Sequence, residues 1–160
     1  MVPSIVPLRL TLAHTEQAAV LVTEILVYPA GYELAVSART RVNVQALGRF
    51  SSAASSDGVP SDFLRFGVQY SDGTKATNLG AGARLPGQEP HQPILRTLLV
   101  GGHPHGTDWR YWAWPLPPAG QISLICQWPA LQIPETRADI DAEVILGAVD
   151  GCVDLWPAES

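Results

Sequence analysis

The sequence predicts a mostly β fold: an antiparallel β-sandwich of about eight strands with one short C-terminal helix. Short stretches of alternating apolar and polar residues recur along the chain, as in strands with one buried face. Fourteen glycines and fourteen prolines gather largely between these stretches, where turns are expected. With 160 residues, of which 46% are hydrophobic, the chain can fill one core, so residues 1–160 are predicted to form a single domain.

The N-terminal third has the clearest strand pattern. Every second residue from Val6 to Leu12 is Val or Leu, and Pro7 places this strand at a sheet edge or at a strand start. A second strand is expected over residues 18–28. There the charge of Glu24 predicts an inward face made of Leu21, Thr23, Ile25 and Val27.

Two hairpins follow from turn chemistry. Residues 29–31, Pro-Ala-Gly, predict a tight turn into an alternating strand over residues 32–42. Residues 71–74, Ser-Asp-Gly-Thr, join an alternating strand at residues 64–70 to a short strand at 75–79. Loops are expected at residues 51–58 and 80–93, which are rich in Ser, Ala, Gly and Pro.

Three further strands and a helix complete the prediction. The apolar run 94–100 reads as a strand buried on both faces apart from Arg96, and residues 101–107 as a glycine-bounded turn. A strand over 109–114 must stop at Pro115. The last strand is residues 121–128, with Ile122, Leu124, Cys126 and Trp128 on one face.

The C-terminal region predicts a helix over residues 142–149 with Asp141 as its cap and Gly151 as its stop. Its apolar stripe is expected to consist of Val144, Ile145, Ala148 and Val149.

Composition excludes several classes of partner. The ten basic residues are scattered singly and the net charge is −5, which argues against nucleic-acid binding. Seven acids and only Arg137 lie between residues 135 and 159. No apolar run reaches the ~20 residues that span a bilayer, and the first residues lack a signal-peptide pattern. The expected compartment is the cytoplasm, where Cys126 and Cys152 should both be reduced and Cys126 buried.

Two tryptophan-containing stretches have a recognisable pattern. Residues 112–120 (WAWPLPPAG) and 128–137 (WPALQIPETR), together with 65–73 and 76–79, resemble a family of small uncharacterised actinobacterial proteins with WxWPLPPxG and WPAxxIPETR motifs. The resemblance covers most of the chain except 43–62 and 80–93. It implies a single domain, and it brings no activity, cofactor or catalytic residue with it.

His103-Pro-His105 is the one pattern with metal-ligand spacing. Two imidazoles two residues apart at a strand end can bind one metal, as in cupins, and His91, Asp108 or His14 would have to complete the site. A cupin-like site also needs a later His, and none follows His105. The alternative is a loop with two solvent-exposed histidines.

Aromatic residues are in excess on one strand. Trp109 and Tyr111 are expected on one face, and Arg110, Trp112 and Trp114 on the other. An aromatic surface flanked by Arg suits a protein partner or a sugar ring. Alternatively, the C-terminal segment around Trp156 buries this second face.

These observations favour a non-catalytic binding or assembly module, with a protein partner or self-association and no cofactor. The alternative is a small metal-dependent enzyme of cupin-like type that uses His103 and His105.

Overall fold

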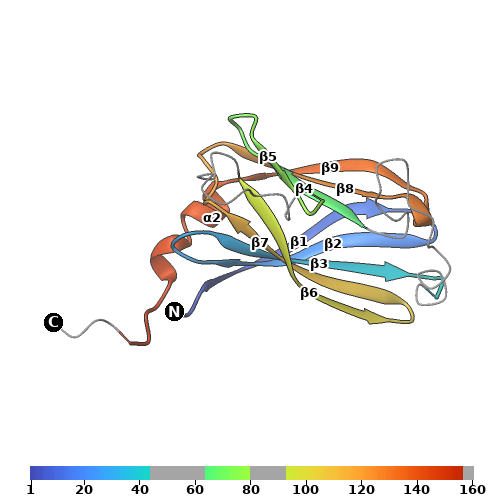
Figure 1. Ribbon diagram of the computed structural model, residues 1–160, viewed down its shortest axis with the longest axis horizontal. Helices are drawn as coiled ribbons and strands as arrows, with labels where there is room; N and C mark the ends of the chain where they lie inside the picture. The colour runs from blue at the N-terminus through green and yellow to red at the C-terminus, as the bar shows by residue number, and fades with distance from the viewer. Residues whose placement is uncertain (44–63, 80–92, 157–160) are drawn as a thin grey trace, which may run out of the picture.

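A computed structural model of the chain describes residues 1–43, 64–79 and 93–156, which form nine strands in two antiparallel sheets packed face to face (Figure 1). The larger sheet has the order β1 (Ser4–His14), β2 (Ala18–Val27), β3 (Tyr32–Thr40), β7 (Gly106–Trp114), β6 (Ile94–His103). The smaller sheet has the order β5 (Lys75–Thr77), β4 (Arg65–Gln69), β8 (Gln121–Trp128), β9 (Ile133–Asp141). The fold class predicted from the sequence, a mostly β sandwich, is confirmed.

The core lies between the sheets and is filled by the alternate residues of the central strands. Tyr32, Leu34 and Val36 of β3 are fully buried, as the alternation predicts. Aromatic rings join the two layers. Tyr111 of β7 stacks on Phe66 of β4 with ring centroids 5.0 Å apart, and Trp109 of β7 meets Trp128 of β8 edge-on at 5.7 Å.

A hydrogen-bonded pair of tyrosines also spans the core. The hydroxyl oxygens of Tyr32 and Tyr70 are 2.8 Å apart, and the Tyr70 hydroxyl donates to the carbonyl oxygen of Pro115 at 3.4 Å. Strand β7 ends before Pro115, as predicted. Pro115 follows Trp114 through a cis peptide bond. The buried hydroxyls of Tyr32 and Tyr70 are therefore satisfied within the core.

The predicted inward face of β2 is wrong in its first half. Ile25 and Val27 are buried as expected, but Val20 and Val22 point inward in place of Leu21 and Thr23. The register between β2 and β3 shifts between Val22 and Glu24, which makes Thr23 an extra residue. A bulge inserts one extra residue into the strand. The buried residues are therefore even-numbered before Thr23 and odd-numbered after it.

The prediction that strand 94–100 is buried on both faces is also wrong. Leu95 is 1% exposed, but every residue of β6 from Arg96 to His103 is exposed. The β6 strand lies outermost in the larger sheet, beyond β7 (yellow in Figure 1). Its neighbour in the smaller sheet is β5, which has only three residues and cannot cover a strand of ten.

The turn expected at residues 101–107 is tighter than predicted. It consists of Pro104 and His105, so Gly101, Gly102 and His103 extend β6, and His103 pairs with Gly106. Gly106 has no space for a side chain, because a Cβ there would lie 2.5 Å from the His103 ring and 2.7 Å from the Ala38 carbonyl oxygen.

The C-terminal region differs in two ways. Strand β9 was not predicted; it contains Pro134 and alternates exposed with half-buried residues at the edge of its sheet. The predicted helix is shorter: α2 covers Glu143–Leu146, and a 3-10 turn, η2, follows at Val149–Gly151. Asp141 does accept the Glu143 backbone N–H at 2.9 Å, as a capping residue would.

Within the expected apolar stripe of that helix, Ile145 is buried and Val144 is exposed. A further 3-10 turn, η1, covers Pro129–Leu131. No helix among the described residues has the length and apolar character to cross a membrane. The predicted loop at 51–58, and 80–92 of the second loop, lie outside the described residues.

Burial raises the pKa most strongly for the three tyrosines of the core. It raises the pKa of Tyr32 well above the ordinary value and that of Tyr70 to about 12, and it raises the pKa of Tyr111 strongly. Tyr28, the fourth tyrosine of the chain, is half-buried at the surface.

Alkaline pH should therefore unfold the protein. Tyrosines of the unfolded chain lose their protons near pH ~10, whereas the native core retains them to higher pH, so the contribution of these tyrosines to the free energy of unfolding should be fully present below pH ~10 and be lost above it. A titration of phenolate absorbance, run beside circular dichroism, should show Tyr28 ionising first and the other three only as the β signal is lost. The Tyr28→Phe variant should lack the first step. Ionisation of all four tyrosines with an unchanged dichroism spectrum would contradict the assignment.

Candidate functional site

The β7 strand divides the predicted site residues between two faces. Trp109 and Tyr111 are buried in the core, while Arg110, Trp112 and Trp114 lie half-buried on the outer face of the larger sheet. The predicted alternation is thus present.

Arg110 is held by carboxylates from the neighbouring strands. Its Nη2 donates to Glu24 Oε1 of β2 at 2.8 Å, and its Nη1 lies 3.7 Å from Glu33 Oε2 of β3. The Tyr28 hydroxyl donates to Glu33 Oε1 at 3.4 Å, and burial together with the charge of Glu33 raises the pKa of Tyr28. All three charged side chains stay partly exposed, so each pair contributes at most ~1 kcal/mol of stability.

Trp112 is packed by the β2–β3 turn. Its ring meets Tyr28 edge-on with centroids 5.7 Å apart. A Cβ on Gly31 would lie 2.7 Å from the Trp112 ring and 2.5 Å from the Ala113 carbonyl oxygen, so only glycine allows this close approach.

Trp156 is 80% exposed, and the chain leads away from the sheets beyond η2 (Figure 1). The partial cover of Trp112 therefore comes from Tyr28 and Gly31 and not from the Trp156 side chain.

Sequence reasoning missed the exposure of three consecutive apolar residues on β6. Leu98, Leu99 and Val100 are 46%, 61% and 56% exposed. Cross-strand pairing sets Arg96 opposite Trp112 and Leu99 opposite Arg110, so Arg96 and Leu99 lie on the outer face, whereas Val100 lies opposite Trp109 on the inner side of the sheet. The apolar run was visible in the sequence, but its exposure was not.

The structure describes His103, His105 and Asp108 of the predicted metal site. His103 and His105 are exposed in and beside the β6–β7 turn, and His105 Nδ1 lies 3.2 Å from the Thr40 carbonyl oxygen. His91 lies outside the described residues. Within residues 1–43, 64–79 and 93–156, no group of three or more His, Cys, Asp or Glu side chains could hold a metal ion.

Asp108 is occupied by other partners. Its Oδ1 accepts from Ser37 Oγ at 2.6 Å and from Arg39 Nη1 at 3.1 Å. Burial would raise the pKa of Asp108, but the hydrogen bonds from Ser37 and Arg39, with the charge of Arg39, outweigh it and lower the pKa. Asp108 thus joins β3 to β7 on the outer face.

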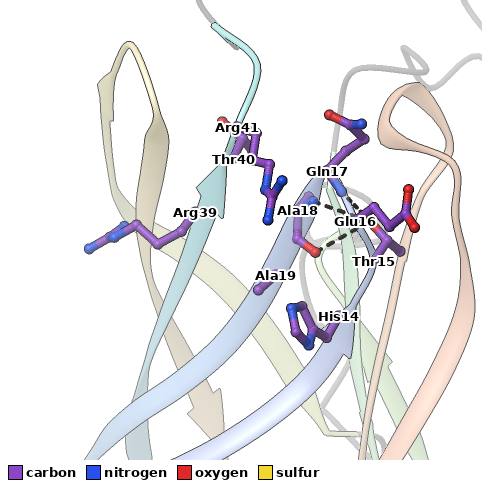
Figure 2. Close-up of a pocket in the computed structure, with 9 residues that line it drawn as sticks. All are labelled: His14, Thr15, Glu16, Gln17, Ala18, Ala19, Arg39, Thr40 and Arg41. Carbon is purple, nitrogen blue, oxygen red and sulfur yellow. Dashed lines mark hydrogen bonds between the residues drawn. The ribbon is translucent and has the colours of Figure 1, made fainter.

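A cavity of about 700 Å³ lies at the end of the larger sheet (Figure 2). It is lined by His14, Thr15, Glu16, Gln17, Ala18, Ala19, Arg39, Thr40 and Arg41. Arg41 and His14 point toward the space between β3 and the β1–β2 turn, whereas Arg39 points away. Thr15 Oγ1 accepts the backbone N–H groups of Gln17 and Ala18 and so builds the turn. The cavity is lined by charges of both signs, among them Glu16 and Arg41.

A second cavity, of about 310 Å³, lies on the outer face of the smaller sheet. Lys75 and Arg137 line it together with Glu135, and Arg137 Nη2 donates to Gln69 Oε1 at 2.9 Å.

Comparison with known proteins yields no match to a family model, a curated protein or a solved structure. The resemblance based on the two tryptophan motifs stays a prediction.

Both cysteines are free, as predicted, but their environments differ. Cys126 is 1% exposed, its Sγ lies 3.2 Å from Thr136 Oγ1, and burial raises its pKa. Cys152 is half-buried, and its Sγ donates to the Val27 carbonyl oxygen at 3.0 Å.

Thiol labelling should therefore be biphasic. A disulfide-exchange reagent should react with Cys152 in the native state and with Cys126 only after unfolding, because Cys152 is partly accessible whereas Cys126 is buried and its pKa is raised by burial. The Cys152→Ser variant should lose the fast phase and keep the slow one. Equal rates for the two thiols, or one native disulfide, would contradict this reading.

The histidines of the β6–β7 turn should tolerate replacement. We expect His103→Ala/His105→Ala to change the free energy of unfolding by no more than ~0.5 kcal/mol, because both side chains are exposed. Denaturant unfolding of the double variant measures this. A stoichiometric metal that is present in the parent protein and lost in the double variant would instead support the metal-dependent enzyme.

Proposed function

We propose that this chain is a non-catalytic binding or assembly module whose contact surface is the outer side of β7 together with the exposed edge strand β6. The observation that carries the proposal is the exposure of Leu98, Leu99 and Val100 in one continuous strand. Isolated apolar residues are normal on protein surfaces, but contiguous apolar patches mark interaction sites.

The composition of the neighbouring β7 face supports the same function. Trp112, Trp114 and Arg110 belong to the residue types enriched among interface hot spots. The Glu24–Arg110–Glu33 ion pairs and the Tyr28–Trp112 contact hold this face in one arrangement. A preorganised surface loses little side-chain entropy on binding, so more of its contact energy appears as affinity.

The proposed compartment is the cytoplasm. Two free thiols, one of them half-buried near the surface, are what a reducing compartment maintains.

Replacement of Trp114 should separate binding from stability. Trp114 is half-buried on the outer face, so Trp114→Ala should weaken association by ~2 kcal/mol or more with little loss of stability. Trp109→Ala is the matched control. It removes a buried ring that contacts Trp128 and should destabilise the fold by ~3–5 kcal/mol. Thermal melting measures stability.

Association is measured by placing a photo-reactive amino acid at position 98 and irradiating cells that naturally make the protein. We expect a covalent adduct whose partner is identified by mass spectrometry and whose yield falls in the Trp114→Ala background. The same photo-reactive group at Glu135, which is exposed on β9, should form none. Adducts of equal yield at both positions, or at neither, would refute the proposed contact surface.

A further inference from the structure

We propose that β6 pairs in antiparallel fashion with the β6 strand of a second copy of this chain, which joins two five-stranded sheets across a two-fold axis. The inference rests on the proposed function and names its partner. It follows from the edges of the two sheets, the order of residues along β6 and the distribution of charge.

The open edge of β6 supplies the backbone for such a pairing. Within the described part of the chain, β6 has β7 as its neighbour on one side and no strand on the other. The outer row of backbone N–H and C=O groups is therefore a template for an added strand. Leu98 has no cross-strand partner on β7, because the register shifts between Thr97 and Leu99.

The other three sheet edges are protected against pairing. Strand β1 contains Pro7, and β5 has only three residues. Strand β9 contains Pro134 and alternating charges from Glu135 to Asp141. Short edges, prolines and charges are among the devices that prevent edge-to-edge association. Between Ile94 and His103 there is no proline, lysine or carboxylate, and one arginine.

The residue order of β6 is complementary to itself. The strand covers residues 94–103, so its midpoint falls between Leu98 and Leu99. Antiparallel pairing about that point sets Leu98 against Leu99 of the second copy, Thr97 against Val100, and Arg96 against Gly101. A Cβ on Gly101 or Gly102 would meet no atom within 4 Å, so the Arg96 side chain of the second copy has room there.

The charge distribution also favours a second copy at this edge. A net charge of −5 would make two copies repel each other, but seven of the acids lie in residues 135–159. Strand β9, which contains three of them, packs beside β1, whereas β6 lies on the side of β5. Pairing through β6 therefore keeps the acidic edges of the two copies apart.

The size of the contact indicates a reversible dimer. The exposed segment from Arg96 to His103 has eight residues and is roughly 27 Å long. A single strand edge of that length lies at the lower end of specific interfaces, so we expect a dissociation constant of the order of 1–100 µM.

Sedimentation velocity of the full chain tests the proposal. Over a concentration range that brackets that constant, the parent protein should shift from a 17.2 kDa monomer to a particle of twice this mass. The variant Leu98→Lys/Leu99→Lys should weaken the dimer at least ~30-fold, because lysines then face lysines across the axis. Ile5→Lys is the matched control, since Ile5 is an exposed apolar residue on β1, the opposite edge of the same sheet, and its dimer should persist.

Charge reversal identifies the partner as a second copy. Leu98→Glu/Leu99→Glu should be monomeric alone, and mixing it with the double-lysine variant should restore a dimer that contains one chain of each. Both variants should melt near the temperature of the parent, because the replaced side chains are exposed.

Three results would overturn the proposal: a parent protein that stays monomeric throughout, a dimer that survives the double-lysine variant, or a dimer lost in Ile5→Lys instead. A photo-adduct from position 98 with a different protein, beside a monomeric parent, would overturn self-pairing and leave the proposed binding function standing. Absence of any adduct and of any dimer would refute both.

Discussion

The packing of the five-stranded sheet on the four-stranded sheet is the constraint from which the rest of this structure follows. Tyr111 stacked on Phe66 and Trp109 against Trp128 connect the two layers at the centre of the core. Burial of these inner faces provides the main driving force for folding, because apolar surface leaves water on both sheets at once. The hydroxyls of Tyr32 and Tyr70, which enter the core, are satisfied by each other and by the carbonyl oxygen of Pro115.

The unequal number of strands gives the protein its most distinctive surface. Because the smaller sheet ends at the three-residue strand β5, no described strand of that sheet covers the residues of β6 beyond Leu95, which are exposed. The side chains of Leu98, Leu99 and Val100, which would be buried in the core of a wider sandwich, are exposed to solvent. The same geometry makes β6 an open edge, so apolar side chains and unpaired backbone groups occur together, and both favour an added strand.

The outer face of the larger sheet is ordered by contacts between distant parts of the chain. Arg110 binds Glu24 across 86 residues of sequence, and Asp108 binds Arg39 across 69. These exposed ion pairs add little stability, but they position β2, β3 and β7 side chains around Trp112. An arrangement of this kind suits recognition better than acid–base chemistry, because the charges are already paired and the aromatic rings remain partly accessible.

Local pattern determined much of this protein without any structure. The sequence predicted the sandwich, the faces of β3, β7 and β8, and the shared face of Arg110, Trp112 and Trp114, because a strand alternates with period two wherever its ladder is regular. Only the tertiary structure decided the bulge at Thr23, the exposure of β6 and the partners of Arg110. The alternation of a strand is a property of its own residues, whereas its register and its cover depend on which strand lies beside it and which sheet lies beneath it.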